Sequence, residues 1–142
     1  MATVGDLANI PLFGSLSESD LEELANWFDV QTVGDGVKLT IEGGDGYSFY
    51  VLIEGTAVVT AEDATVADYV PGDFFGEMAI LGGTRRNATV TTTSPARLLF
   101  MFGTEFRRLE QAQPAIAARL EEVMRQRQEE LVQLRQGAGE QS

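Results

Sequence analysis

Residues 75–90 read FGEMAILGGTRRNATV, and this stretch is the most informative part of the sequence for both fold and function. The apolar run 78–81 is too short for a free-standing helix, and the glycine pair 82–83 interrupts it. A single helical turn that leads into a loop of glycines and arginines is a natural anion site. Helix N-termini and loop amides present unpaired N–H donors and the positive end of the backbone dipole.

Two kinds of charged side chain in this stretch narrow the ligand further. Arg85 and Arg86 supply planar, permanently charged guanidinium groups, which match the oxygens of a phosphate. Glu77 is out of place beside a ligand that is only an anion, but its carboxylate can accept a hydrogen bond from a hydroxyl. Phosphate and hydroxyl together suggest a nucleotide.

This stretch resembles the phosphate-binding cassette of cyclic-nucleotide-binding domains, the type found in catabolite activator proteins and protein kinase A regulatory subunits. That cassette reads roughly F-G-E-[LI]-A-[LI], followed by R-[AST]-A-[TS]-V, and the resemblance extends over roughly residues 7–134. It implies a mainly β fold with flanking helices. The expected architecture is an eight-stranded jelly-roll β-barrel with N-terminal helices and C-terminal hinge or lid helices.

The resemblance also implies roles for individual residues of the cassette. Glu77 corresponds to the glutamate that holds the ribose 2′-hydroxyl, and Arg86 to the arginine that pairs with the cyclic phosphate. The sequence departs from the family at Asn87, where a small residue is usual, and at Arg85, where proline is common. The remaining ligand contacts, largely through the backbone, are expected from Gly76, Met78, Ala79, Asn87 and Ala88.

Each charged residue also has a simpler explanation. An isolated Arg85–Arg86 pair is most often a solvated loop pair, and an isolated Glu77 is most often a surface carboxylate. The order of glycine, glutamate, arginine and alanine favours the ligand role over these explanations.

Histidine and cysteine are both absent from the 142 residues. This excludes histidine general bases, cysteine nucleophiles, zinc sites of the Cys/His type and disulfide bonds. The acidic loop 42–46 suggests calcium by its composition, but its spacing does not match an EF-hand. We therefore predict no catalytic residues, no metal site and no cofactor, and we do not expect an enzyme.

Charge is distributed unevenly along the chain. Residues 1–71 hold 13 of the 22 acidic residues and a single basic one, Lys38, whereas the second half is balanced. A net charge of −12 disfavours binding to nucleic acid, because that affinity comes largely from phosphate neutralisation. No apolar run is long enough for a membrane span and no secretory signal is visible, so we predict no membrane partner and a cytoplasmic location.

The first 28 residues are predicted to form a helical lead-in to a β region. Residues 7–13 are expected to form a short helix that ends near Pro11, followed by a hydrophobic turn. Ser17 is expected to cap a second helix, since acidic residues fill the following turn. The apolar face of this helix, which we expect to pack against the barrel, is formed by Leu21, Leu24, Ala25 and Phe28.

Short β-rich runs alternate with glycine turns over residues 29–102, as an all-β barrel or jelly roll requires. Glu54-Gly55 is the tightest break and predicts a hairpin. The predicted strands are residues 29–33, 37–41, 48–53, 56–60, 65–70, 88–93 and 96–102.

The C-terminal region is predicted to be helical over residues 103–136, with a break before Pro114 and a disordered tail over 137–142. The last helix carries a stripe of residues spaced three and four apart, which Arg127 interrupts. Three interpretations stay open: packing on its own barrel, pairing with a second copy as a homodimer, or folding over the nucleotide as a lid. A lid would cover the base with an apolar residue such as Met124 or Leu131. The stripe consists of Ala117, Leu120, Met124, Arg127, Leu131 and Leu134.

These observations predict one domain over residues 1–142 that acts as a regulatory sensor of a cyclic nucleotide. Its C-terminal helix is expected to change position when the ligand binds and to act on an effector protein of unknown identity. Cyclic AMP is the expected ligand, with cyclic GMP as the alternative. In the family a threonine after the cassette arginine accompanies cyclic GMP preference, and Asn87 is neither that threonine nor the common alanine. Its amide could reach a guanine edge or a phosphate oxygen. The rival interpretation is an interaction or scaffold module that uses the same barrel without a ligand.

Overall fold

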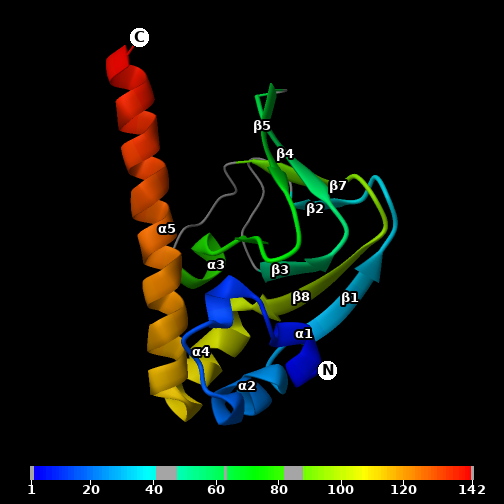
Figure 1. The fold of residues 1–142 in the computed structure, drawn as a ribbon, viewed down its shortest axis with the longest axis vertical. Coiled ribbons are helices and arrows are strands. Elements are labelled where there is room, and N and C mark those ends of the chain that lie inside the picture. Colours follow the sequence, from blue (N-terminus) through cyan, green and yellow to red (C-terminus); the bar gives the residue numbers. More distant parts are fainter. Residues whose placement is uncertain (1, 41–47, 63, 82–87, 142) are drawn as a thin grey trace.

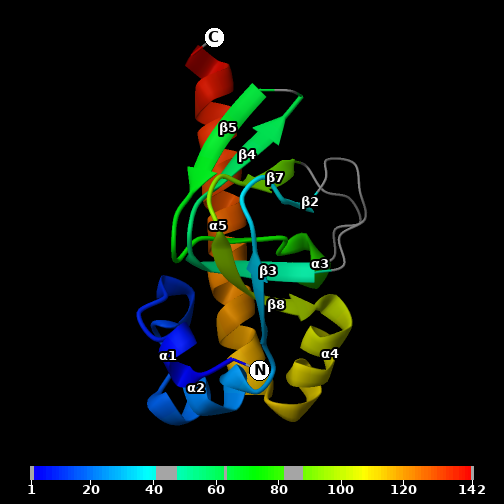
Figure 2. The same cartoon turned by 90° about the vertical axis from the view of Figure 1, so that its right-hand side faces the viewer.

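In the computed structural model, two four-stranded antiparallel sheets form the centre of the molecule and helices flank them (Figure 1). The structure describes residues 2–40, 48–62, 64–81 and 88–141. Side chains are described for these residues except Met78, Ala79, Gln128 and residues 130–141. Helices α1, α2 and α4 gather at one end of the sheets, and the β4–β5 hairpin lies at the other (Figures 1 and 2).

All seven predicted strands are present within the described residues, with ends that shift by about one residue. Strand β8 is apolar at almost every position, and it lies between β1 and β3 in its sheet. The strands are β1 (Asp29–Val33), β2 (Lys38–Thr40), β3 (Ser48–Glu54), β4 (Ala57–Ala61), β5 (Ala64–Tyr69), β6 (Phe74–Phe75), β7 (Thr89–Thr92) and β8 (Ala96–Phe102). Among the strands of the described residues, only the two-residue strand β6 was not predicted.

The strand order is that of a two-sheet jelly roll. One sheet has the order β1-β8-β3-β6 and the other β2-β7-β4-β5, so strands distant in sequence become neighbours. Within the described residues no strand pairing joins the two sheets. The prediction of a mainly β fold with eight strands is confirmed. In the described residues the strands form two facing sheets, whose inner side chains pack together, and these sheets do not close into a barrel.

The hairpin predicted at Glu54-Gly55 is wrong, because β3 and β4 lie in different sheets and do not pair. These residues form a tight turn between the two sheets, and the turn requires its glycine. Gly55 has φ +93°, and a Cβ atom at this position would lie 2.4 Å from the carbonyl oxygen of Pro95. Neither the backbone angle nor the space admits a side chain.

We therefore expect Gly55→Ala to lower the free energy of unfolding by about 1–3 kcal/mol, as backbone strain of this kind costs. Chemical denaturation measures this change. Gly34→Ala is the matched control, because a Cβ atom there meets nothing within 4 Å. Equal stability of the two variants would contradict the close approach of the β3–β4 turn to Pro95.

The N-terminal helices begin where their capping side chains stand. Helix α1 (Val4–Leu7) starts earlier than predicted, because Thr3 caps it and Asp6 completes a capping box. The helix predicted from residue 7 to about Pro11 is therefore wrong, whereas the hydrophobic turn predicted after it is present as the 3-10 turn Pro11–Phe13. Helix α2 (Glu18–Ala25) is capped as predicted, since Ser17 Oγ accepts from the backbone N–H of Asp20 at 3.1 Å.

The main hydrophobic core lies between the sheet of β3 and β8 and the helices. Phe28, Phe49 and Phe74 form a chain of ring contacts through it, with centroids 6.3 Å and 5.8 Å apart. Helix α4 (Gly103–Ala112) adds Phe106 and Leu109, both fully buried. This core fixes the helices against the sheet from which the candidate site is built.

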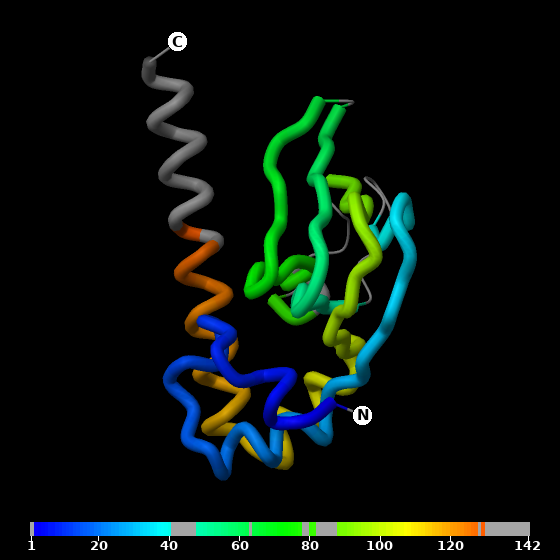
Figure 3. The backbone as a smooth tube through the Cα atoms, turned by 45° about the vertical axis from the view of Figure 1, so that its right-hand side comes forward, coloured from blue at the N-terminus to red at the C-terminus, as the bar shows by residue number. Residues whose placement is uncertain are grey.

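Helix α5 runs beside the sheets along the long axis of the molecule (Figure 3). Ala117, Leu120 and Met124 are buried in the main core, so the prediction that this helix packs on its own domain is confirmed for that part. Its predicted end at residue 136 is wrong, because α5 spans Pro114–Gln141 and includes most of the tail predicted to be disordered. A glycine costs a helix about 1 kcal/mol relative to alanine, which is too little to stop one by itself.

No helix within the part of the chain that the structure describes is long and apolar enough to cross a membrane.

Candidate functional site

The candidate site begins where β6 ends. Residues 71–73 form a turn, in which the carboxylate of Asp73 accepts from the backbone N–H of Val70 at 2.7 Å. Strand β6 then pairs antiparallel with β3, with Phe75 opposite Tyr50 and Phe74 opposite Val51. Gly76 follows with φ +80°, a conformation that favours glycine, and turns the chain out of the strand.

Glu77 lies directly before helix α3 (Met78–Leu81). Its carbonyl oxygen accepts from the backbone N–H groups of Ile80 at 2.9 Å and Leu81 at 2.8 Å, which closes the single helical turn expected from the sequence. Its side chain is only 6% exposed. The explanation of Glu77 as an ordinary surface carboxylate is therefore wrong, because the residue is buried.

Helix α4 holds the far end of α3 in place. Arg107 donates to the carbonyl oxygen of Ile80 at 2.6 Å and to the carboxylate of Glu110 at 2.5 Å. Ile80 itself is buried in the main core. The turn that carries Glu77 is thus tied to strand β3 on one side and to α4 on the other.

The two described ends of the cassette meet in one apolar cluster. Phe75 and Val90 are buried in this cluster between the sheets, and Ala88 packs against it. The hydroxyl of Thr40 donates to the carbonyl oxygen of Ala88 at 3.3 Å. The fold therefore brings Gly76, Glu77 and α3 to the same region as Ala88. The predicted residues Arg85, Arg86 and Asn87 lie outside the described residues, as does the acidic loop 42–46, and so do the side chains of Met78 and Ala79.

Three stacked aromatic rings line the inner side of this region. Phe75 lies between Tyr50 and Tyr69, with ring centroids 5.1 Å and 5.3 Å away and interplanar angles below 20°. Burial raises the pKa of the Tyr69 hydroxyl, and the nearby carboxylates of Glu77 and Asp73 raise it further, whereas Arg127 opposes the rise. Tyr69 therefore stays a neutral hydrogen-bonding group at physiological pH.

Arg127 is a residue of this region that the sequence analysis did not select. From α5 its guanidinium donates to the carbonyl oxygen of Phe74 and, at 3.3 Å, to the hydroxyl of Tyr69. It also lies 4.3 Å from the centre of the Phe74 ring. The interruption of the apolar stripe is explained by this contact, and a single polar residue within such a stripe was the available signal.

The expected lid residues have separate outcomes. Met124 is 0% exposed within the main core, so in this structure it presents no surface to a ligand. The side chain of Leu131 lies outside those described.

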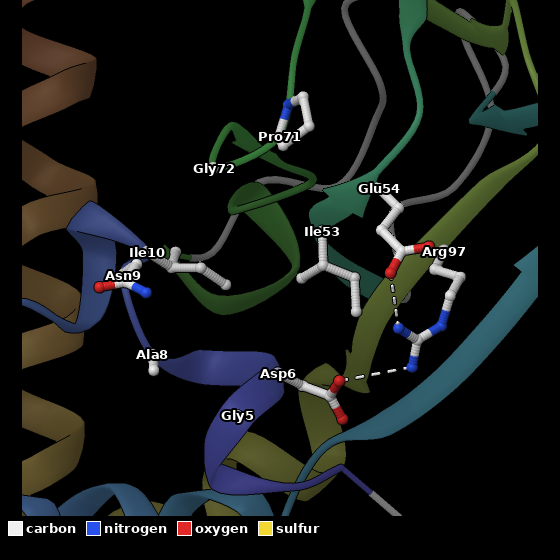
Figure 4. Close-up of a pocket in the computed structure, with 10 residues that line it drawn as sticks. All are labelled: Gly5, Asp6, Ala8, Asn9, Ile10, Ile53, Glu54, Pro71, Gly72 and Arg97. Atoms are coloured by element: carbon white, nitrogen blue, oxygen red, sulfur yellow. Dashed lines mark hydrogen bonds and ion pairs between the residues drawn. The ribbon is translucent and has the colours of Figure 1, made fainter.

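A cavity of about 240 Å³ lies apart from the cassette, between α1 and the sheet end of β3 and β8 (Figure 4). Arg97 crosses it and contacts the carboxylates of Asp6 at 3.3 Å and Glu54 at 3.0 Å. With two carboxylates around one guanidinium, this cavity does not favour a phosphate. We interpret the bridge as a tether that holds α1 on the sheet.

This tether predicts a pH dependence of stability. The backbone N–H of Thr3 and then the Arg97 guanidinium hold the pKa of Asp6 below its ordinary value of 3.8. A carboxyl group whose pKa is lower in the folded state stabilises the fold at pH values above its ordinary pKa. This stabilisation is lost as the pH falls through the folded-state pKa. We expect Asp6→Asn to lower the melting temperature at pH 7. The lost helix cap and surface ion pair together contribute about 0.5–1 kcal/mol to the free energy of unfolding.

The difference between wild type and Asp6→Asn should shrink as the pH falls below about 4. Asp68→Asn, at an exposed position of β5, is the control and should change the melting temperature less. A difference between wild type and Asp6→Asn that is constant from pH 7 to pH 2 would contradict the tether.

Comparison with known families assigns this fold. Residues 31–113 match the model of the cyclic nucleotide-binding domain, which is more than half of the chain. The chain belongs to the cyclic nucleotide-binding domain family. The resemblance inferred from residues 75–90 is thereby confirmed.

Relatives in this family belong to different kinds of larger protein. The chain is 32% identical over 103 residues to the cAMP-dependent protein kinase regulatory subunit of Hypocrea atroviridis, covering 72% of this chain and 22% of that protein. It is also 32% identical over 111 residues to the cyclic nucleotide-gated potassium channel RHE_CH03180 of Rhizobium etli, covering 78% and 31%. The chain thus spans less than a third of the length of these curated relatives.

Solved structures with this fold agree. The cAMP-bound PfPKA-R (141-441) superposes with a TM-score of 0.81 at 23% identity, over 96% of this chain and 46% of that chain. The catabolite activator protein of Thermus thermophilus superposes with a TM-score of 0.78 at 23% identity, over 90% and 63%. At 23% sequence identity, this similarity shows only that the fold is shared.

Proposed function

We propose that this chain is a regulatory module that binds a cyclic nucleotide through residues 75–90. The observation that carries the proposal is the buried carboxylate of Glu77, which follows a left-handed glycine at the start of α3 and shares its region with Ala88. A buried carboxylate at the start of a helix suits a ligand that offers both a hydroxyl and an anionic group.

The roles within the site follow the family pattern. Glu77 accepts from the ribose 2′-hydroxyl, and Arg86 neutralises the cyclic phosphate. Backbone groups of Gly76, Met78, Ala79, Asn87 and Ala88 complete the contacts. The printed names of the relatives, a cAMP-dependent kinase subunit and a cyclic nucleotide-gated channel, support a cyclic nucleotide as the ligand class.

Cyclic AMP is the preferred ligand in this proposal, and α5 changes its position when the ligand binds. The module has no catalytic activity of its own and acts on an effector protein. A homodimer through α5 and a cytoplasmic location stay predictions from the sequence.

A thermal-shift titration with cyclic AMP and cyclic GMP, run side by side, tests the proposal. A ligand that binds only the folded chain stabilises it by about 2.7 kcal/mol at a hundredfold excess over its Kd. We expect a saturable rise in melting temperature, with the larger rise for cyclic AMP. If neither nucleotide raises the melting temperature of the folded protein, the proposal fails and the interpretation as a scaffold module without a ligand is favoured.

A further inference from the structure

Arg127 joins α5 to the two strands that lead into the candidate site. Its guanidinium donates to the carbonyl oxygen of Phe74 in β6 and to the hydroxyl of Tyr69 in β5, and it lies over the Phe74 ring. One side chain thus makes two hydrogen bonds and two cation–π contacts, the second with the Tyr69 ring at 5.8 Å. Hydrogen bonds from a charged group are stronger than those between neutral groups, and the cation–π contacts add to them.

Both partners of Arg127 are close to the cassette along the chain or in space. Phe74 is three residues before Glu77, and its neighbour Phe75 stacks on Tyr69 at 5.3 Å. The Glu77 carboxylate also interacts electrostatically with Tyr69 and contributes to the rise in the pKa of the Tyr69 hydroxyl. A shift of the backbone at β6 would therefore reach Arg127 directly.

The chemistry of this contact requires arginine. A lysine carries the same charge as a compact ammonium group, but it lacks the planar fork that can donate to two separated oxygens while it stacks on a ring. The carbonyl oxygen of Phe74 belongs to the backbone, so the contact reports the position of the strand rather than that of a mobile side chain.

We propose that Arg127 is a positioning residue for the nucleotide site: it docks α5 on β5 and β6, and this docking sets the affinity of residues 75–90 for the ligand. The inference rests on the proposed function. Coupling of this kind is reciprocal. If the bound ligand favours the docking of α5 by a certain factor, then the loss of docking weakens ligand binding by the same factor.

Binding measurements on arginine variants of α5 test this coupling. By isothermal titration with cyclic AMP we expect Arg127→Ala to bind about tenfold more weakly than wild type, as the loss of a charged hydrogen bond implies. Arg127→Lys should bind almost as weakly, because charge alone does not restore the fork. The matched control is Arg125→Ala, since Arg125 is exposed on the same helix and pairs with Glu121 at 3.4 Å; it should bind within twofold of wild type.

A distance measurement separates positioning from a general loss of structure. The chain has no cysteine, so spin labels can be placed at Glu129→Cys on α5 and Thr93→Cys after β7 without background labelling. In nucleotide-free wild type we expect a distance distribution that saturating cyclic AMP narrows, because the ligand favours the docked position of α5. Arg127→Ala should broaden it, and saturating cyclic AMP should narrow it again.

Tyr69→Phe is the milder variant, and it keeps the ring that stacks on Phe75. It should weaken cyclic AMP binding about threefold and broaden the distances less than Arg127→Ala, even where the alanine variant does not fold. Affinities within twofold of wild type, or weaker binding with an unchanged distance distribution, would overturn the positioning role.

The two proposals fail in different ways. If wild type binds no cyclic nucleotide, the proposed function fails, whatever the variants do. If wild type binds cyclic AMP and the Arg127 and Tyr69 variants bind it equally well, the proposed function stands and the role of Arg127 is overturned.

Discussion

Replacing Arg86 by alanine will weaken the binding of cyclic AMP at least about thirtyfold. The cyclic phosphate carries a full negative charge, and the resemblance to the family assigns its partner to Arg86. Removing one member of such a charge pair costs about 2–5 kcal/mol, and thirtyfold corresponds to about 2 kcal/mol. The strongly acidic chain leaves few other groups to compensate, because residues 1–71 contain a single basic residue, Lys38.

Isothermal titration of wild type and Arg86→Ala with cyclic AMP measures this loss. Arg108→Ala, at an exposed position of α4, is the matched control and should bind within twofold of wild type. Arg85→Ala is informative for another reason, because Arg85 adds a second charge beside the cassette arginine. Unchanged affinity of Arg86→Ala would remove Arg86 from the site and with it the assigned register of the cassette.

The second large effect is on stability, and we expect it from Phe49→Ala. Phe49 is 1% exposed in β3, opposite Met101 of β8, and its ring lies between those of Phe28 and Phe74. Truncation of a buried phenylalanine costs about 3–5 kcal/mol through lost transfer energy and the cavity left behind. A domain of this size has about 5–15 kcal/mol in total, so the variant should lose a large fraction of its stability.

Urea denaturation followed by circular dichroism measures the change in the free energy of unfolding. Phe102→Ala is the matched control, since Phe102 lies 47% exposed at the end of β8. It should lose less than about 1 kcal/mol, as surface substitutions usually do. Similar losses for the two phenylalanines would contradict the position assigned to the core between the β3–β8 sheet and the helices.

The strands could be predicted from the sequence because alternation and turn residues act locally. Strand β8 reads as a central strand, and Gly55 marks a tight turn between β3 and β4, because both signals depend on a few adjacent residues. The pairing partners of β3 and β4 were not predictable in this way, since the two strands lie in different sheets. Strand β6 could not be predicted, since two residues carry no periodicity. Its pairing with β3 arises from the tertiary fold.

The helix boundaries show where local signals compete. The N-cap of α2 at Ser17 was predictable from its side chain, whereas α1 begins at Val4 because Thr3 and Asp6 cap each other. The continuation of α5 past Gly137 shows that one glycine does not outweigh propagation of a long helix. The sequence signals indicated that helices exist, and the capping contacts fixed where they begin.

The candidate site was predictable in part for the same reason. Gly76, Glu77 and the turn of α3 are contiguous, so their order in the sequence carries their arrangement. Arg127 is 50 residues from Glu77 and joins the region only through folding. A sequence pattern marks it as an interruption of an apolar stripe but does not show which strand it contacts.

The central claim is that residues 75–90 form the binding site for a cyclic nucleotide. Amide chemical-shift mapping of the isotope-labelled chain during titration with cyclic AMP tests this claim most directly, because the protein is only 15.4 kDa. The account predicts saturable shifts that concentrate at Gly76, Glu77, α3 and Ala88. No saturable shift on folded protein, or shifts confined to the cavity around Arg97, would contradict it.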